Sequence, residues 1–330
     1  MKKVLVTGAN GHVGNNLVRA LMKENVEIRA GIRNLNNKHL LEALACEVVH
    51  LDFLDPVTLE KSLEGIDVLY QVAAVFKHWS SDEEKEIVEP NVIGTRNILE
   101  AAHKAGVEKI VYVSSIAALE QHKRNENGEI MTTAYNESDQ LNPYVRSKTL
   151  SEMEAWKVAQ ALDLNLVTVL PSTIIGGTYK KTTETLAAFS ALVNGKMPFT
   201  YEMCLNFIDA DDIAKGMILA AQKGVKGKRY VLSNTEALPM EMVIEIAKEI
   251  NPSLVPPTLL TEQQILTLAD KSEEEAKKTN SRPRIIKSNV IRTLGVEFKF
   301  DLTETVKDLE FQPRSGELVL RETLNELFEK

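Results

Sequence analysis

Short apolar runs alternate with segments of helical periodicity along the chain up to Pro171. The apolar runs are KKVLVTG, VEIRAGIR, CEVVHLD, DVLYQVAA, KIVYVSS and NLVTVLP, and helix-compatible stretches such as NNLVRALMKEN, TLEKSLEG and TRNILEAAHKAG lie between them. Strands that are apolar throughout are typical of a parallel sheet with helices on both faces. The pattern therefore predicts an α/β fold built on a doubly wound parallel sheet.

The rhythm changes after Pro171, where ETLAAFSALVNG, FIDADDIAKGMILAAQKG and ELVLRETLNELFEK have helical patterns and RYVLSN has that of a short strand. We expect a smaller mixed α/β C-terminal lobe to follow the sheet. The expected domain boundaries are 1–175 for the sheet domain, which 206–237 rejoin, and 176–205 with 238–330 for the second lobe.

Composition and charge indicate which kinds of partner and which cellular compartment the protein is expected to have. The 330 residues are 44% hydrophobic and 26% charged, and 47 acidic against 39 basic residues give a formal charge of -8. This balance disfavours nucleic acid and anionic membranes as partners. Cys46 and Cys204 lie too far apart for a zinc or redox pair, and the apolar run at the N-terminus is too short for a signal peptide. We expect a cytoplasmic protein, a monomer or homodimer, that acts on a small molecule.

The segment TGANGHVG places glycines at 8, 11 and 14 between an apolar strand and an amphipathic helix. In that context, backbone N–H groups and the helix N-terminus can face a pyrophosphate. A glycine turn without a ligand is the alternative. We expect His12 to face solvent at a variable position of the loop. The candidate dinucleotide-binding residues of this segment are Thr7, Gly8, Asn10, Gly11, His12, Val13 and Gly14.

The second strand ends in AGIRNLNNKHL, which has no acidic residue to bind the ribose hydroxyls of NAD(H). Arg33 and Lys38 stand there instead, and cations suit a 2'-phosphate. NADP(H) is therefore favoured as the cofactor and NAD(H) is possible, with a solvated surface lysine as the alternative for Lys38. Asp52 and Phe53 end the third strand at the adenine side of the cleft, and Asp55 before Pro56 fits a helix cap.

The segment NPYVRSK predicts a helix start, with Asn142 as its cap and Pro143 in its first turn. Tyr144 and Lys148 then share one helix face, where the ammonium and the helix dipole are expected to lower the tyrosine pKa. Ser115 ends the strand KIVYVSS at the crevice where such sheets bind ligands. Singly, each group has an ordinary surface or capping alternative. Together with the glycine loop, their order along the chain becomes a specific signal.

These motifs, with QVAA at 71–74, NVIGTRNILEAA at 91–102, LPSTIIGG and FIDADDIA, resemble the extended short-chain dehydrogenase/reductase family. This family is part of the NAD-dependent epimerase/dehydratase superfamily, and the chain is most similar to its dihydroflavonol reductase, cinnamoyl-CoA reductase and aldehyde reductase branch. The resemblance runs from Lys2 to about Asn234 and returns weakly in the last residues. It implies a Rossmann-type sheet that binds a dinucleotide and a second lobe that binds substrate.

The resemblance also implies roles for single residues. Tyr144 would be the proton donor, Lys148 would bind the nicotinamide ribose and lower the tyrosine pKa, and Ser115 would steady the carbonyl oxygen. Asn91 would help to arrange active-site water and helix geometry. Ala73 and Ala74 would form the cofactor wall, and Pro171, Ser172 and Thr173 would lie beside the nicotinamide ring. Two positions depart from the family: Gln71 stands where histidine is frequent, and Gly177 where proline is frequent.

Hydride transfer between the nicotinamide and a carbonyl carbon, with the proton from Tyr144, is the expected reaction. Nucleotide-sugar epimerases and dehydratases use the same triad. Two of their usual features are missing here, because Ile116 and Ala117, rather than acids, follow Ser115, and LPSTIIG has no arginine and aromatic pair. A dinucleotide-sensing regulator without chemistry is a third possibility.

Aromatic residues near the expected cleft suggest an apolar or aromatic substrate, with ordinary packing as the alternative. The candidate substrate-binding residues are Phe76, Trp79, Ile116, Tyr135, Tyr144, Phe199 and Tyr201. Lys77 and His78 can bind an acidic group of the substrate. Their presence on an exposed loop face, without a ligand, is the alternative. Capping explains Asp209, Asp211 and Asp212 better than a metal does, and no histidine has metal-ligand spacing.

Overall fold

The structure is a computed structural model that describes residues 1–139, 142–179 and 182–329. The strands of its central sheet are β1 (Lys2–Thr7), β2 (Val26–Ile32), β3 (Glu47–His50), β4 (Val68–Gln71), β5 (Lys109–Val113), β6 (Leu166–Pro171) and β11 (Arg229–Leu232). The helices that cover this sheet are α1 (His12–Leu21), α2 (Pro56–Leu63), α3 (Glu89–Lys104), α4 (Pro143–Ala161) and α6 (Ala210–Lys223). Short turns of 3-10 helix lie at Leu35–Leu41 and Ile116–Ala118, and a π-helical turn at Glu84–Val88 precedes α3.

The central sheet has the strand order β11-β6-β5-β4-β1-β2-β3, and all neighbouring strands run parallel. The predicted doubly wound, Rossmann-type sheet is therefore confirmed. The order reverses between β1 and β4, and in open α/β sheets the crevice at such a reversal receives the ligand.

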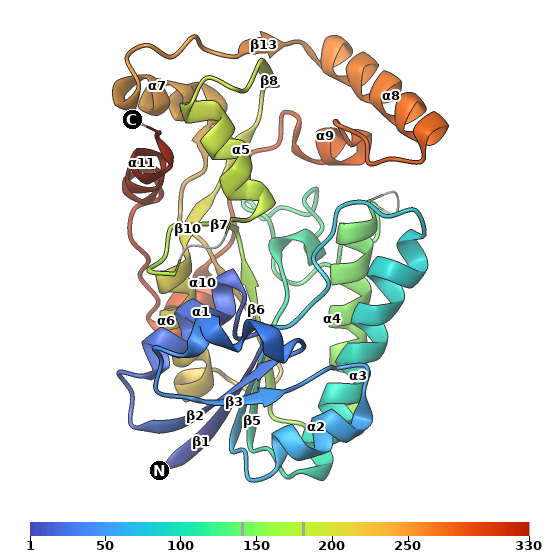
Figure 1. Cartoon of the computed structure of the whole chain (residues 1–330), viewed down its shortest axis with the longest axis vertical. Coiled ribbons are helices and arrows are strands. Elements are labelled where there is room, and N and C mark those ends of the chain that lie inside the picture. The colour runs from blue at the N-terminus through green and yellow to red at the C-terminus, as the bar shows by residue number, and fades with distance from the viewer. Residues whose placement is uncertain (140–141, 180–181, 330) are drawn as a thin grey trace.

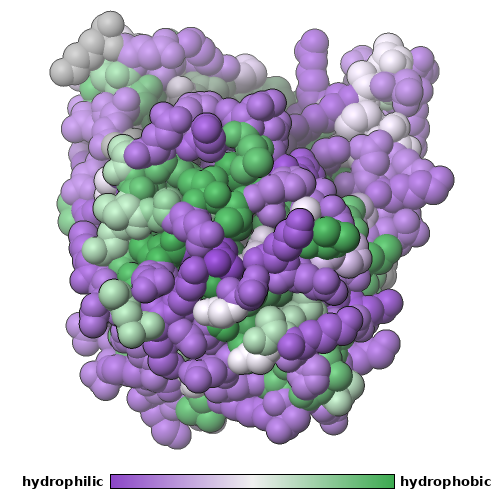
Figure 2. All heavy atoms as spheres, turned by 60° about the horizontal axis from the view of Figure 1, so that its bottom comes forward, coloured by the Kyte–Doolittle hydropathy of each residue, from purple (hydrophilic) through white to green (hydrophobic). Residues whose placement is uncertain are grey.

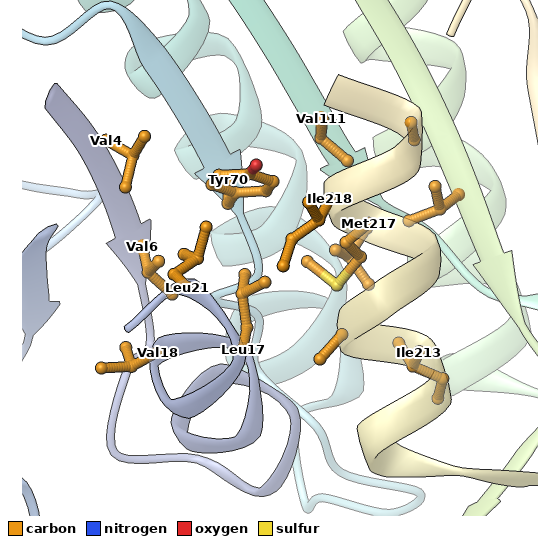
Figure 3. Packing of buried hydrophobic residues seen from close by; sticks show 14 of the residues in the cluster. Val4, Val6, Leu17, Val18, Leu21, Tyr70, Val111, Ile213, Met217 and Ile218 are labelled. Atoms are coloured by element: carbon orange, nitrogen blue, oxygen red, sulfur yellow. The ribbon is translucent and has the colours of Figure 1, made fainter. Parts of the chain in front are cut away.

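Two apolar layers hold the helices on the sheet. On one face, Leu17 and Leu21 of α1 and Met217 of α6 pack against Val6 and Tyr70 of the strands (Figure 3). On the other face, side chains of α2, α3 and α4 enclose a second cluster around Leu69 and Ile110. Covering both faces explains why the strands are apolar at successive positions rather than at alternate ones.

The remaining elements form most of the upper part of the molecule (Figure 1). They are β7 (Thr173–Ile175), α5 (Glu184–Val193), β8 (Phe199–Tyr201), β9 (Cys204–Leu205), β10 (Phe207–Asp209), β12 (Leu238–Pro239), α7 (Met240–Ile250), β13 (Thr258–Leu260), α8 (Glu262–Thr279), α9 (Lys287–Thr293), α10 (Thr303–Leu309) and α11 (Gly316–Leu327). The strands among them pair as β7 with β10, β9 with β12 and β8 with β13. At two or three residues each, they are too short to give a period-two sequence pattern.

The chain passes between the two parts more than once. RYVLSN rejoins the sheet, because β11 pairs with β6. The later helix α10 also packs on α6 and β11, whereas α5, α7 and α11 enclose a separate apolar cluster. The lobe boundaries expected from the sequence stay a prediction.

Polar and charged side chains cover most of the face seen in Figure 2, and hydrophobic atoms gather in patches between them. Among the described residues, we find no helix with the length and apolar character needed to span a bilayer.

Candidate active site

The glycine segment forms a tight turn between β1 and α1. Gly8 has a φ of +62°, a conformation that other residues rarely adopt, and its Cα faces Ala73 of the neighbouring strand end. A Cβ on Gly14 would lie 2.3 Å from the carbonyl oxygen of Gly8, so α1 begins as close to the turn as a backbone can. This is the geometry that lets a helix N-terminus approach a pyrophosphate.

The prediction that His12 faces solvent was wrong. The His12 side chain is buried, and its Nε2 lies 2.8 Å from the carbonyl oxygen of Gly176, beyond β7. Burial lowers the pKa of His12, which favours the neutral ring. The residue therefore ties the start of α1 to the second lobe. Asn10 and Val13, its neighbours in the loop, are half-buried.

The end of β2 carries the two cations expected from the sequence. Arg33 and Lys38 are both exposed, and neither has a hydrogen bond or ion pair to another described residue. Both side chains are thus available to a phosphate. At the end of β3, Asp52 Oδ1 accepts from the N–H of Leu54, and Phe53 is buried. Asp55 caps α2 as predicted, since its Oδ1 accepts from the Val57 N–H.

The cleft wall after β4 is fixed from β1. The hydroxyl of Thr7 donates to Gln71 and accepts from the N–H groups of Val72 and Ala73, with all three distances between 2.8 and 2.9 Å. Gln71 also donates to the carbonyl of Ala73 at 3.0 Å. Gln71, which stands where histidine is frequent in the family, therefore contributes a hydrogen bond to this cleft wall. Ala74, the next residue, is exposed.

The opposite wall follows β6. Pro171 and Ser172 are buried, and Thr173 opens β7. The buried Oγ of Ser172 has no hydrogen-bond partner among the described residues. A buried hydroxyl is usually satisfied, so this atom fits a polar ligand. Together with the glycine turn and the free cations after β2, it makes the cleft suitable for a nicotinamide dinucleotide.

Tyr144 and Ser115 meet at the predicted crevice. Asn142 caps α4 through its Oδ1, which accepts from the N–H groups of Tyr144 and Val145 at 3.1 Å each. This cap brings the Tyr144 hydroxyl to 3.3 Å from Ser115 Oγ at the end of β5. Ser115 also caps the short helix that follows, accepting from Ala117 N–H at 3.1 Å. The two alternatives for this serine, site residue and cap, are therefore compatible.

The tyrosine pKa differs from the expectation. Burial raises the pKa of Tyr144, and this effect outweighs the lowering by the Ser115 hydrogen bond and the Arg292 charge. The Lys148 ammonium, which was expected to lower the Tyr144 pKa, is not among the groups that do so. The phenol therefore keeps its proton at neutral pH in the protein alone, which suits a proton donor more than a base.

Lys148 lies one helical turn beyond Tyr144 on α4. Burial lowers the pKa of Lys148 to about 8, although the Glu152 carboxylate opposes this effect. The ammonium has no hydrogen bond or ion pair to another described residue, which leaves its donors available to a ligand hydroxyl.

Sequence reasoning missed Glu152, whose side chain is fully buried. Its carboxylate accepts from Ser114 Oγ at 2.6 Å and from Thr168 Oγ1 at 3.0 Å, and it pairs with Arg229 of β11. A buried acid needs such partners. The available signal was the spacing of Tyr144, Lys148 and Glu152, which places the three residues on one helix face.

Asn91 fastens the loop after β4 to the helices. Its Oδ1 accepts from Val75 N–H at 2.7 Å, and its Nδ2 donates to the Val75 carbonyl at 2.9 Å. The same Nδ2 lies 3.0 Å from the Ile87 carbonyl and 2.7 Å from Ser147 Oγ on α4. Asn91 is thus a positioning residue, which agrees with the helix-arranging role that the resemblance implies.

The loop fixed by Asn91 brings two rings onto Tyr144. The ring centroids of Phe76 and His78 lie 5.1 and 4.8 Å from that of Tyr144. His78 is half-buried rather than part of an exposed loop face, whereas Lys77 is exposed and pairs with Glu86. Phe76 is therefore in contact with the ring of the candidate proton donor, Tyr144.

The other substrate candidates make their contacts with other residues. Trp79 lines a cavity of about 590 Å³ between its loop and the α8–α9 segment. Tyr135 stacks under the Arg229 guanidinium at 4.4 Å, and Tyr201 bonds Thr293 of α9 at 2.8 Å. Ile116 packs half-buried beside the end of β5, and Phe199 pairs in β8. The structure brings Phe76 alone among the six other candidates into ring contact with Tyr144 in the described residues.

The acidic start of α6 is a capping arrangement. Asp209 is the cap and accepts from Asp211 N–H, while Asp211 accepts from Thr178 and Asp212 from Lys215. Within residues 1–139, 142–179 and 182–329, no cluster of three or more His, Cys, Asp or Glu is placed to hold a metal ion.

The sequence of the chain is similar to those of known proteins, both in the segments that form this cleft and outside them. Residues 4–233 match the model of the NAD dependent epimerase/dehydratase family. A putative dihydroflavonol 4-reductase of Synechocystis is 36% identical over 69% of this chain and 67% of its own length. A cinnamoyl-CoA reductase of Medicago truncatula is 26% identical over 93% of this chain and 95% of its own.

A solved structure of yeast methylglyoxal/isovaleraldehyde reductase Gre2, complexed with NADPH, aligns with a TM-score of 0.77 at 21% identity and covers 98% of both chains. At that identity the likeness shows the fold alone. The family match and the reductase relatives together carry the assignment of activity. The chain belongs to the NAD dependent epimerase/dehydratase family and is an NAD(P)-dependent oxidoreductase.

Proposed function

We propose that the protein is an NADP(H)-dependent reductase of an aldehyde or ketone, able to oxidise the alcohol in reverse. The observation that carries this proposal is the Tyr144 hydroxyl 3.3 Å from Ser115 Oγ at the crevice end of β5. Both hydroxyls can reach one carbonyl oxygen, so one can donate a proton while the other donates a hydrogen bond.

In this reaction the bound cofactor supplies a hydride to the carbonyl carbon. Tyr144 donates the proton to the carbonyl oxygen, so that one hydride and one proton convert the carbonyl to an alcohol. Ser115 stabilises the oxygen as its negative charge develops. Lys148 would bind the ribose hydroxyls through its ammonium, which has no other hydrogen bond or ion pair among the described residues.

NADP(H) is the proposed form of the cofactor because Arg33 and Lys38 are exposed and unpaired after β2, where no acid stands. The glycine turn would hold the pyrophosphate. Asp52 and Phe53 would face the adenine, and Ala73, Ala74, Pro171, Ser172 and Thr173 would enclose the nicotinamide end. Residues 1–175, with 206–237, are the proposed dinucleotide domain, and 176–205 with 238–330 the substrate lobe.

The test follows NADPH and NADH oxidation with a panel of aliphatic and aromatic aldehydes and ketones. Tyr144→Phe keeps the ring that packs on Phe76 and removes the hydroxyl, so we expect NADPH binding without turnover. Tyr230→Phe, which loses a hydroxyl bonded to Asp308 away from the proposed cleft, is the matched control. NADPH binding with no carbonyl reduced by the parent would contradict the proposal, and turnover of a nucleotide sugar would assign an epimerase or dehydratase instead.

A further inference from the structure

The helix α9 of the second lobe is fixed over the start of α4 (Figure 1). Asn142, the cap of α4, donates from Nδ2 to Asn289 Oδ1 at 2.6 Å. At the other end of α9, Thr293 bonds Tyr201 of β8 at 2.8 Å. These two bonds hold α9 against β8 and against the start of α4, the helix that carries Tyr144.

Arg292 follows Asn289 by three positions and therefore shares its face of α9. Its Nε is buried and has no hydrogen-bond partner, and the guanidinium forms no ion pair with any described residue. The guanidinium carbon lies 5.9 Å from the centroid of the Phe298 ring, so this ring covers one face of the group. Burial lowers the pKa of Arg292, and the charges of Tyr144 and Asp139 oppose this effect.

A second unpaired nitrogen lies on the opposite lobe. His78 packs on Tyr144, and its buried Nδ1 has no hydrogen-bond partner among the described residues. Burial lowers the pKa of His78. The Glu184 charge opposes this effect, and the Arg292 and Arg282 charges lower the pKa further. A neutral imidazole can donate one hydrogen bond without adding a charge.

The acid whose charge acts on His78 is already paired. The Glu184 carboxylate accepts hydrogen bonds from both Nη groups of Arg282, at 2.8 and 2.7 Å. Buried polar atoms without partners are costly, and the presence of two in this cleft fits a polar ligand. A guanidinium edge matches the two oxygens of a carboxylate or phosphate.

We infer that Arg292 and His78 form a subsite for an anionic oxygen group of the substrate. The substrate class is then an acidic carbonyl compound, whose carboxylate or phosphate lies between the lobes while its carbonyl faces Tyr144 and Ser115. This inference rests on the proposed reductase function and deepens it. It replaces the purely apolar substrate that Phe76 and the other aromatic residues suggest with an amphiphilic one.

Matched substrate pairs test the subsite. The pairs are 4-carboxybenzaldehyde with benzaldehyde, levulinate with 2-pentanone, and glyceraldehyde 3-phosphate with glyceraldehyde, each with NADPH. We expect the parent to favour at least one acidic member by about 10- to 100-fold in kcat/KM, and Arg292→Met to abolish that preference. The carboxylate and phosphate pairs tell the two anions apart. Lys287→Met removes an α9 cation paired with Asp270 and should keep the preference.

Equal use of acidic and neutral members by the parent, or an equal loss for both in Arg292→Met, would overturn the subsite. Arg292→Lys should restore part of the preference, which a purely structural role would not predict. Binding of benzoate against benzamide to the NADPH complex gives a readout without turnover. Benzoate bound by the parent but not by Arg292→Met supports the subsite even if no carbonyl is reduced, a result that would sink only the reductase proposal.

Discussion

Glu152 and Arg229 form a buried, two-point ion pair, with Nε and one Nη of the arginine 2.8 and 3.0 Å from the two carboxylate oxygens. The pair joins α4 to the edge strand β11, and Glu152 lies one turn beyond Lys148 on α4. The carboxylate also accepts from Ser114, the neighbour of Ser115. The pair therefore fixes the backbone behind both proposed catalytic groups.

Glu152→Gln keeps the shape of the side chain but leaves Arg229 without its counter-charge. Removing one partner of a buried pair costs about 3–5 kcal/mol, so we expect a loss of this order in the free energy of unfolding, measured by urea titration. Glu154→Gln on the same helix breaks a pair with Arg96, which is 45% exposed, and should cost about 0–1 kcal/mol. A Glu152→Gln protein as stable as Glu154→Gln would show that the buried pair contributes little.

Asn91→Ala should loosen the loop that carries Phe76 and His78. The change leaves the N–H and the carbonyl of Val75 without their partner, which costs about 1–3 kcal/mol. We expect faster amide hydrogen exchange at Val75 and a lower kcat. Asn97→Ala removes a single bond from the same helix to the Phe53 carbonyl and is the control. Unchanged exchange at Val75 would rule out the positioning role.

Arg33→Ala tests the choice of cofactor. Loss of a charge-assisted bond to the 2'-phosphate should raise the Kd for NADPH by about 10- to 100-fold and leave that for NADH nearly unchanged. Calorimetric titration of both nucleotides measures this. Lys23→Ala, an exposed position just after α1, should alter neither Kd. Equal weakening of both nucleotides would mean that Arg33 does not recognise the 2'-phosphate.

Lys148 should make stability depend on alkaline pH. Its ordinary pKa of 10.5 falls to about 8 in the folded protein, so between these values the unfolded chain binds more protons and stability rises with pH. At and below pH 8 the buried charge costs on the order of 3 kcal/mol, which is relieved by pH 10.5. Unfolding titrations from pH 7 to 10.5 on the parent and Lys148→Met measure the difference. If the two free energies stay parallel across this range, the lysine is not buried as described.

The sequence determined the sheet and the main groups of the site through local rules. Strands buried on both faces must be apolar throughout, and the caps Asn142 and Asp55 use bonds within three residues of themselves. The topology of parallel strands brings their carboxyl ends to one crevice. The sequence alone therefore predicted that Ser115 and Tyr144 lie close together. Their 3.3 Å separation agrees with that prediction.

Tertiary structure alone decided what each group faces. His12 points inward to the carbonyl of Gly176, which is 164 residues away along the chain. Arg292 of the proposed subsite lies on a helix that the sequence pattern did not single out. The raised pKa of Tyr144 is likewise a consequence of burial by Phe76, His78 and the second lobe. Local sequence encodes periodicity and capping, whereas burial and charge in a cleft depend on distant segments that only folding brings together.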